Sequence, residues 1–248
     1  MKPKETRRTL AALLIIAATS GPGLAHAQEA GAMPARPASL SNAEFKALYL
    51  ARQDSARMRF TEADVYFVTG MISHHAQALV MSELAPTHGA SPSVETLAAR
   101  IINAQRDEIA LMQRWLEDRG QPVPQVKIDG LILTIEMSAP TGNEGHDAQM
   151  VHDAAGAHEH HLPGMLTQEQ LEELAAAFGP QFDHLFLTYM IQHHAGAVTR
   201  VHDLFSVDGA GQDGVVFKLA SDIQMDQITE IERMTQMVDA MAEQDAGR

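Results

Sequence analysis

Two histidine pairs lie inside apolar stretches of the chain and point to metal chemistry. The sequence MISHHAQALVM spans residues 71–81, and MIQHHAGAV spans residues 190–198. A helix turns about 100° per residue, so in each stretch the first methionine and both histidines share a stripe about 120° wide. Imidazole with thioether suits copper, above all soft Cu(I), whereas carboxylate-rich sites suit Mg, Ca or Mn. The predicted metal ligands are Met71, His74, His75, Met190, His193 and His194.

The helical pattern that follows each histidine pair places polar residues among apolar ones. Residues 97–116, LAARIINAQRDEIALMQRWL, carry Gln105 at the centre of the apolar stripe and Glu108 at its edge. Gln227 and Glu230 hold the matching places in the second copy. A buried glutamine or histidine without a partner costs about 1–3 kcal/mol, so these groups should satisfy one another or hold an ion.

Two interpretations of this placement remain open. In the first, a histidine of each pair bonds to the glutamine of the partner helix, His74 to Gln105 and likewise in the second copy, as a polar pin in an apolar core. In the second, copper binds, and the polar residues support it by fixing imidazole tautomers. The predicted supporting residues are Gln105, Glu108, Gln227 and Glu230.

Other methionines and histidines are weaker candidates for metal binding. Methionine at helical spacing more often fills gaps in a core than binds a metal. The region between the two copies has a histidine-rich part without helical period, which is typical of metal capture with little selectivity. The weaker candidates are Met81, Met112, Met234, His146, His152, His158, His160 and His161. At the place that matches Met81, the second copy has Arg200.

The elements that must position these residues are two similar helical hairpins. Capping residues, Pro and Gly predict helices over 61–85 and 91–120, and again over 180–205 and 213–244. Residues match at an offset of 119 before each hairpin loop and 122 after it, as Asp64 matches Asp183. Two hairpins that each leave an apolar face uncovered should pack together, which predicts an all-α four-helix bundle.

The segments around the hairpins complete the predicted organisation. Between them, residues 131–135 make either a short strand or an apolar lid, and a His/Met-rich loop follows. A capping pattern at Thr167 and Gln170 opens a further short helix. The predicted boundaries are 1–27 for a signal peptide, 28–40 for a flexible leader, 41–120 for the first helical repeat, 121–165 for the linker and 166–243 for the second repeat.

The N-terminus has the pattern of a secretion signal. A basic start is followed by the apolar run TLAALLIIAAT at residues 9–19, and AHA at 25–27 offers a cleavage point near Ala27. The run is too short to span a bilayer comfortably. The chain has no cysteine and a formal net charge of −14. These features predict an exported, periplasmic protein that binds neither nucleic acid nor a membrane after signal cleavage.

The stretches MISHHAQALVM and LAARIINAQRDEIALMQRWL resemble the bacterial "domain of unknown function" family numbered 305. The hallmark of that family is Met-Ile-x-His-His followed by a Gln-x-x-Glu-Ile-x-x-Met helix. The second copy, with LASDIQMDQITEIERM at residues 219–234, resembles it too. The resemblance implies a ferritin-like helical bundle, export to the periplasm and, for some members, copper binding through methionine and histidine. It implies the same six ligands, although the methionine expected after the second histidine pair is Arg200.

The leading hypothesis is a periplasmic protein that buffers, sequesters or passes on copper as Cu(I) or Cu(II), without catalysis. Its partners would be the metal ion and a copper-handling protein, and the sequence predicts no oligomeric state. One alternative is an interaction scaffold of the cell envelope without metal. A ferritin-like metal oxidase is a weaker alternative, because it needs Glu-x-x-His motifs and none of the 13 histidines has Glu three residues before it.

Overall fold

The helices and strands lie in one unit of the chain, Asn42–Arg248. The computed structural model describes residues 41–57, 59–138 and 162–246. The predicted signal peptide and leader fall outside these ranges, as do all five histidines of the predicted central loop. The described ranges contain both hairpins and both ends of the linker between them.

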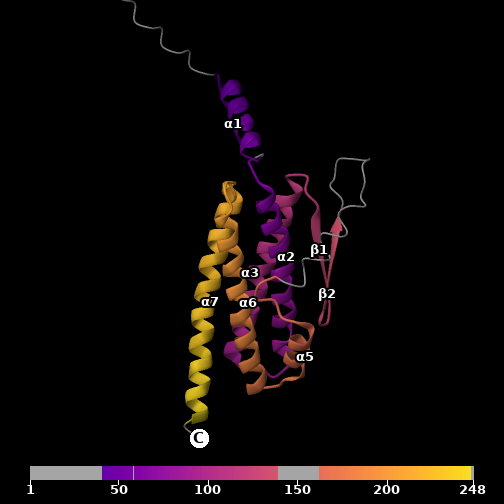
Figure 1. Ribbon diagram of the computed structural model, residues 1–248, viewed down its shortest axis with the longest axis vertical. Helices are drawn as coiled ribbons and strands as arrows, with labels where there is room; N and C mark the ends of the chain where they lie inside the picture. Colours follow the sequence, from indigo (N-terminus) through magenta and orange to yellow (C-terminus); the bar gives the residue numbers. More distant parts are fainter. Residues whose placement is uncertain (1–40, 58, 139–161, 247–248) are drawn as a thin grey trace, which may run out of the picture. The chain divides into compact units, whose positions relative to one another are not determined.

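Both histidine pairs lie on helices that pack against each other. The four helices of the two hairpins are α2 (Glu62–Glu83), α3 (Pro92–Glu117), α6 (Pro180–Ser206) and α7 (Gly214–Ala246). Helix α2 packs against α3, and α6 packs against α7. Helix α2 also contacts α6, which brings the two histidine-bearing helices side by side (Figure 1). The fold is mostly helical, as predicted.

The helix starts follow the predicted capping residues. Thr61 accepts from the backbone of Asp64, whose carboxylate accepts from the Thr61 backbone in return. Thr167 and Gln170 make the same reciprocal pair at the start of α5 (Gln168–Ala176). Each pair satisfies backbone N–H groups that a helix start leaves free. Two shorter helices are α1 (Asn42–Arg57) and the 3₁₀ helix η1 (Ala85–Thr87).

The all-α prediction needs one correction, because the linker begins with a β-hairpin. Strands β1 (Val123–Asp129) and β2 (Ile132–Ser138) pair antiparallel, with Asp129 opposite Ile132. Between them Gly130 has a φ of 60°, a conformation that glycine adopts easily. Partly buried and exposed positions alternate along most of both strands, and inward side chains such as Val126, Ile128 and Leu133 pack on the helical core. Alternation of this kind is the period of a strand, which covers the helices here as a two-stranded lid.

Two aspartates tie each hairpin to the loop of the other. The carboxylate of Asp64, in the first turn of α2, accepts from the backbone N–H of Gly211 at 2.7 Å. The carboxylate of Asp183, in the first turn of α6, accepts from the backbone N–H of Ser91 at 3.1 Å. Gly211 lies in the α6–α7 loop and Ser91 in the α2–α3 loop, so the start of each histidine-bearing helix is fixed against the opposite hairpin.

The core runs through the contact between the hairpins. Fully buried apolar side chains from all four long helices line it, and they include both motif methionines. Within the described ranges, no helix has the length and the apolar character that crossing a membrane requires. The consequence for the candidate site is that its residues lie in the interior and not on the surface.

Candidate metal centre

His74 and His193 lie together where α2 contacts α6. Their ring centroids are 3.9 Å apart, and both side chains are fully buried. His75 lies 6.4 Å from His74, and His194 lies 6.3 Å from His193, measured between ring centroids. The four imidazoles therefore form one row across the interface, two from each helix.

Three of the four imidazoles have one ring nitrogen bonded and the other without a partner. His74 donates from Nε2 to the carbonyl oxygen of Pro163 at 3.1 Å. His75 donates from Nε2 to Glu108 at 2.7 Å, and His194 donates from Nε2 to Glu230 at 2.6 Å. A carbonyl oxygen or a carboxylate accepts, so the hydrogen of each bond belongs to Nε2. The Nδ1 atoms of all three are buried and have no hydrogen-bond partner in the described part of the chain.

His193 is the least satisfied of the four. Neither of its ring nitrogens has a partner in the described ranges. Burial, followed by the proximity of His194 and His75, holds the pKa of His193 well below its usual range. Burial, followed by the proximity of His193, lowers the pKa of His74 in the same way. Both imidazoles are therefore neutral at physiological pH, which is the form that binds metals.

The predicted methionine ligands share this interior. Met71 and Met190 are fully buried, each one helical turn before its histidine pair. The weaker candidates Met81, Met112 and Met234 are also fully buried. Among the described residues, no group of three or more His, Asp or Glu side chains is arranged to hold a metal ion. Each histidine-bearing helix therefore carries one buried thioether a turn before its two buried imidazoles.

The first of the two interpretations, in which a histidine of each pair bonds to the glutamine of the partner helix, is wrong. His74 bonds to Pro163 and not to Gln105, and the amide oxygens of Gln105 and Gln227 are buried without a partner in the described ranges. The two helices of each hairpin are joined instead by a histidine–glutamate pair, His75 with Glu108 in the first and His194 with Glu230 in the second. Of the four predicted supporting residues, the two glutamates therefore fix imidazole tautomers, and the two glutamines make no bond to these imidazoles.

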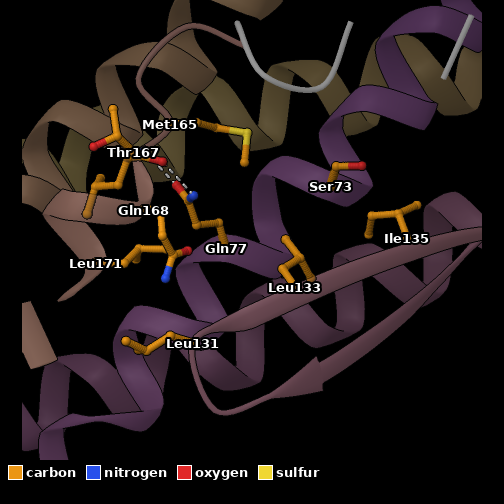
Figure 2. A pocket seen from close by; sticks show the side chains of 10 residues that line it. Ser73, Gln77, Leu131, Leu133, Ile135, Met165, Thr167, Gln168 and Leu171 are labelled. Atoms are coloured by element: carbon orange, nitrogen blue, oxygen red, sulfur yellow. Dashed lines mark hydrogen bonds between the residues drawn. The ribbon is translucent and has the colours of Figure 1, made fainter. Parts of the chain in front are cut away.

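A strap over the histidines, Leu162–Leu166, was not predicted. Its Pro163 carbonyl bonds to His74, and its Leu166 exchanges two hydrogen bonds with the amide of Gln77 at 3.0 and 2.7 Å (Figure 2). Gly196 of α6 lets the strap approach, since a Cβ there would lie 1.9 Å from the Pro163 oxygen. An isolated glycine inside a helical pattern is the signal that could have indicated this close contact.

The strap also borders a cavity beside the histidines. Met165 lines it together with Ser73 and Gln77 of α2 and the apolar side chains of the β-hairpin (Figure 2). Its volume is about 340 Å³. Ser73 is the neighbour of His74 in the chain, so the cavity lies against the same turn of α2 that carries the first histidine pair.

The part of the chain that matches a known protein family includes nearly all of both hairpins. The family described as "Domain of unknown function (DUF305)" matches residues 64–238. The chain belongs to the DUF305 family. The predicted resemblance is thereby confirmed, and the match includes both histidine pairs and the residues bonded to them. No curated protein matches the chain.

Solved structures of the DUF305 family are similar to this chain. A DUF305 fragment from Deinococcus radiodurans is 25% identical with a TM-score of 0.53, covering 73% of this chain and 98% of the fragment. A DUF305 protein from Streptomyces coelicolor is 23% identical with a TM-score of 0.54, covering 73% and 92%. CopM in its Cu(I)-bound form is 26% identical with a TM-score of 0.48, covering 71% and 96%. The first two show that the fold is that of DUF305 proteins.

The buried histidines of this DUF305 chain predict a stability that falls in mild acid. Their pKa values lie well below the usual 6.5, mainly because of burial. Below about pH 6.5 the unfolded chain binds protons at these two residues that the folded chain does not bind. Above about pH 6.5 the two histidines therefore leave the free energy of unfolding undiminished. Below that pH the free energy of unfolding falls, by up to about 1.4 kcal/mol per pH unit for each histidine, until the folded pKa values are reached.

Urea unfolding of the metal-free chain at about pH 6.5 and about pH 5.5 measures this loss. The parent should lose about 2 kcal/mol more than the His74→Gln/His193→Gln variant over that interval. An equal loss in both chains would contradict the assignment of neutral, buried imidazoles.

Proposed function

We propose that this DUF305 protein binds copper, most tightly as Cu(I), and that it buffers, sequesters or passes on the metal without catalysis. The observation that carries the proposal is the pair His74 and His193, which are in contact, fully buried and neutral, with ring nitrogens that have no partner in the described chain. Buried methionines lie one turn away on each helix.

Burial of unpartnered nitrogens is costly unless a ligand uses them. Each buried polar atom left without a partner costs about 1–3 kcal/mol. His74 contributes one such nitrogen and His193 two, all in one interface. In each neutral imidazole one of the two nitrogens carries a free lone pair, and a soft cation bound to that nitrogen would remove its cost. Cu(I) is the ion that favours imidazole combined with thioether sulfur.

The residues around the row would support such an ion. Glu108 and Glu230 accept from His75 and His194 and fix their Nε2–H tautomers. A partner of this kind on the far nitrogen orients a ligating imidazole and raises its basicity. The residues proposed to hold copper are Met71, His74, His75, Met190, His193 and His194, with Met81, Met112 and Met234 nearby in the core.

The architecture and the compartment form part of the same proposal. The pairing of His75 with Glu108 and of His194 with Glu230 supports a ferritin-like four-helix bundle built from two copies of one hairpin. The N-terminal pattern of a basic start, an apolar run and AHA supports export to the periplasm after cleavage near Ala27. Copper would then pass to or from a copper-handling protein of that compartment.

Metal retention by the mature protein tests the proposal. The chain would be loaded separately with Cu(I), Cu(II) and Zn(II), desalted against a competing chelator, and its metal content measured. Two matched variants separate the sites: a loop variant with all five central histidines changed to alanine, and a core variant with His74 and His193 both changed to glutamine. We expect Cu(I) to stay on the parent and the loop variant and to be lost from a folded core variant.

Two other outcomes would count against the proposal. Cu(I) retained by the core variant but lost from the loop variant would move the chemistry to the central histidines. If the folded parent kept no metal at all, the bundle would be an interaction scaffold.

A further inference from the structure

Arg200 is a buried cation on the histidine-bearing helix α6. Its side chain is 5% exposed, and its Nη2 donates to the backbone oxygens of Tyr66 and Phe67, each at 3.4 Å. Gly70 on α2 makes room for it, because a Cβ there would lie 2.3 Å from Nη2. Helix α2 therefore has space for the guanidinium group of Arg200. Arg200 is the residue of the second copy that matches Met81 of the first copy.

The guanidinium lies close to the histidine row. Arg200 and Pro163 line the same cavity of about 200 Å³, and the Pro163 carbonyl accepts from His74. The positive charge of Arg200 also contributes to the low pKa of His74, after burial and the neighbouring histidines. The shared cavity thus connects Arg200 with the strap residue that bonds to His74, and the effect of its charge on the pKa of His74 agrees with this placement.

The charge of Arg200 is only partly balanced. It has no ion pair within the described ranges, where the salt bridges involve other residues. Burial lowers the pKa of Arg200. The negative charge of Asp203, an exposed residue on the same helix, acts against burial and raises this pKa, but by less. The carboxylates of Glu108 and Glu230 pair with His75 and His194, and neither of them forms an ion pair with Arg200.

We propose that Arg200 is a specificity-determining residue that makes the His/Met site select monovalent over divalent cations. The inference rests on the proposed function. Coulomb repulsion grows in proportion to the charge of the bound ion, so a divalent ion feels twice the repulsion of a monovalent one. Neutral imidazole and thioether donors supply no negative charge to offset it. The additional charge on a divalent ion should cost on the order of tenfold in affinity.

Binding of Ag(I) and Zn(II), neither of which changes oxidation state under these conditions, tests the selectivity. The measurements would use the full chain carrying the loop variant, so that the central histidines cannot bind zinc, and competition titrations would give both dissociation constants. The quantity compared is the ratio of Ag(I) affinity to Zn(II) affinity. Melting temperatures of the metal-free chains would be recorded alongside, to confirm that each variant folds.

Three substitutions and a control are expected to change the ratio of Ag(I) to Zn(II) affinity in different ways. Arg200→Gln removes the charge and should lower the ratio about tenfold, and Arg200→Lys keeps the charge and should leave it within about threefold of the parent. Asp203→Asn removes the opposing carboxylate from an exposed position and should raise the ratio by about two- to threefold, because solvent screens this charge. Arg106→Gln, at an exposed arginine paired with Glu83, should change nothing.

The outcomes separate the inference from the proposed function. A ratio unchanged by Arg200→Gln would overturn the role of Arg200 while leaving the metal site intact. If Arg200→Gln did not fold, a ratio lowered or unchanged by Asp203→Asn would overturn it in the same way. Absence of Ag(I) binding by the parent would instead overturn the proposed function itself.

Discussion

Replacing Met71 and Met190 together by leucine should lower the Cu(I) affinity of the chain at least about 100-fold. Loss of a residue that only supports a metal ligand typically costs 10–100-fold, and loss of two sulfur ligands should cost at least as much. Leucine fills nearly the volume of methionine, so stability should change by less than about 1.5 kcal/mol even though both side chains are fully buried. Zn(II) affinity should change little, because zinc does not depend on thioether sulfur.

Competition against a Cu(I) chelator measures this effect, and urea unfolding measures the stability. Met225→Leu is the control, since Met225 is 63% exposed on α7 and should alter neither quantity. Equal Cu(I) affinities in the parent and in the Met71→Leu/Met190→Leu variant would show that the thioethers belong only to the core.

Replacing Asp213 by alanine should destabilise the fold by about 3–5 kcal/mol, the cost of leaving a buried charge unpaired. Asp213 is 3% exposed and pairs with Arg119, whose side chain is 4% exposed. The Asp213 carboxylate also accepts from the indole of Trp115 and from two backbone N–H groups at the start of α7. Alanine would leave the guanidinium without its ion-pair partner and the indole N–H without its acceptor, and it would remove the cap of α7.

The loss should also depend on pH. Burial alone would raise the pKa of Asp213, but the hydrogen bonds from Trp115, Arg119 and Val216 lower it below its usual value. A depressed carboxyl pKa stabilises the fold above the unfolded pKa, and this contribution disappears as the pH falls through the folded pKa. The difference between parent and variant should therefore be largest near neutral pH and shrink in strong acid.

Chemical denaturation of Asp213→Ala beside Glu83→Ala measures the effect. Glu83 pairs with Arg106 on the surface, where both partners are well exposed, so its removal should cost less than about 1 kcal/mol. Similar losses in the two variants would contradict the assignment of Asp213 and Arg119 as a buried, structural pair.

Local signals predicted the helices well because each depends on neighbours in the chain. Thr61 with Asp64, and Thr167 with Gln170, cap their helices through bonds that span three residues. The β-hairpin was harder to predict for two reasons. Its alternation of apolar and polar residues is short, and its inward side chains are buried only once the helices have packed beneath them. Burial in the tertiary structure, and not local preference, stabilises those strands.

In the candidate site, too, local patterns predicted the helical positions, whereas contacts between distant residues were not predicted. Helical spacing placed the histidines correctly on α2 and α6, but it assigned their hydrogen bonds to the glutamine at the centre of each partner stripe. Glu108, at the edge of the stripe, is the residue that reaches His75. Adjacent residues on a helix point about 100° apart, so the two histidines of a pair face different neighbours. The Pro163 carbonyl that bonds to His74 is 89 residues away in the chain, and no local pattern predicts such a contact.

X-ray absorption at the copper edge of the Cu(I)-loaded mature protein shows directly whether histidine and methionine bind the ion together. The spectrum reports the ligand atoms and shows whether a buried His/Met site holds the ion. We predict nitrogen and sulfur scatterers together, at a coordination number of about two to four, in a sample with one copper bound per chain after desalting. A spectrum with nitrogen or oxygen scatterers alone would contradict the account and assign the copper to histidines outside the core.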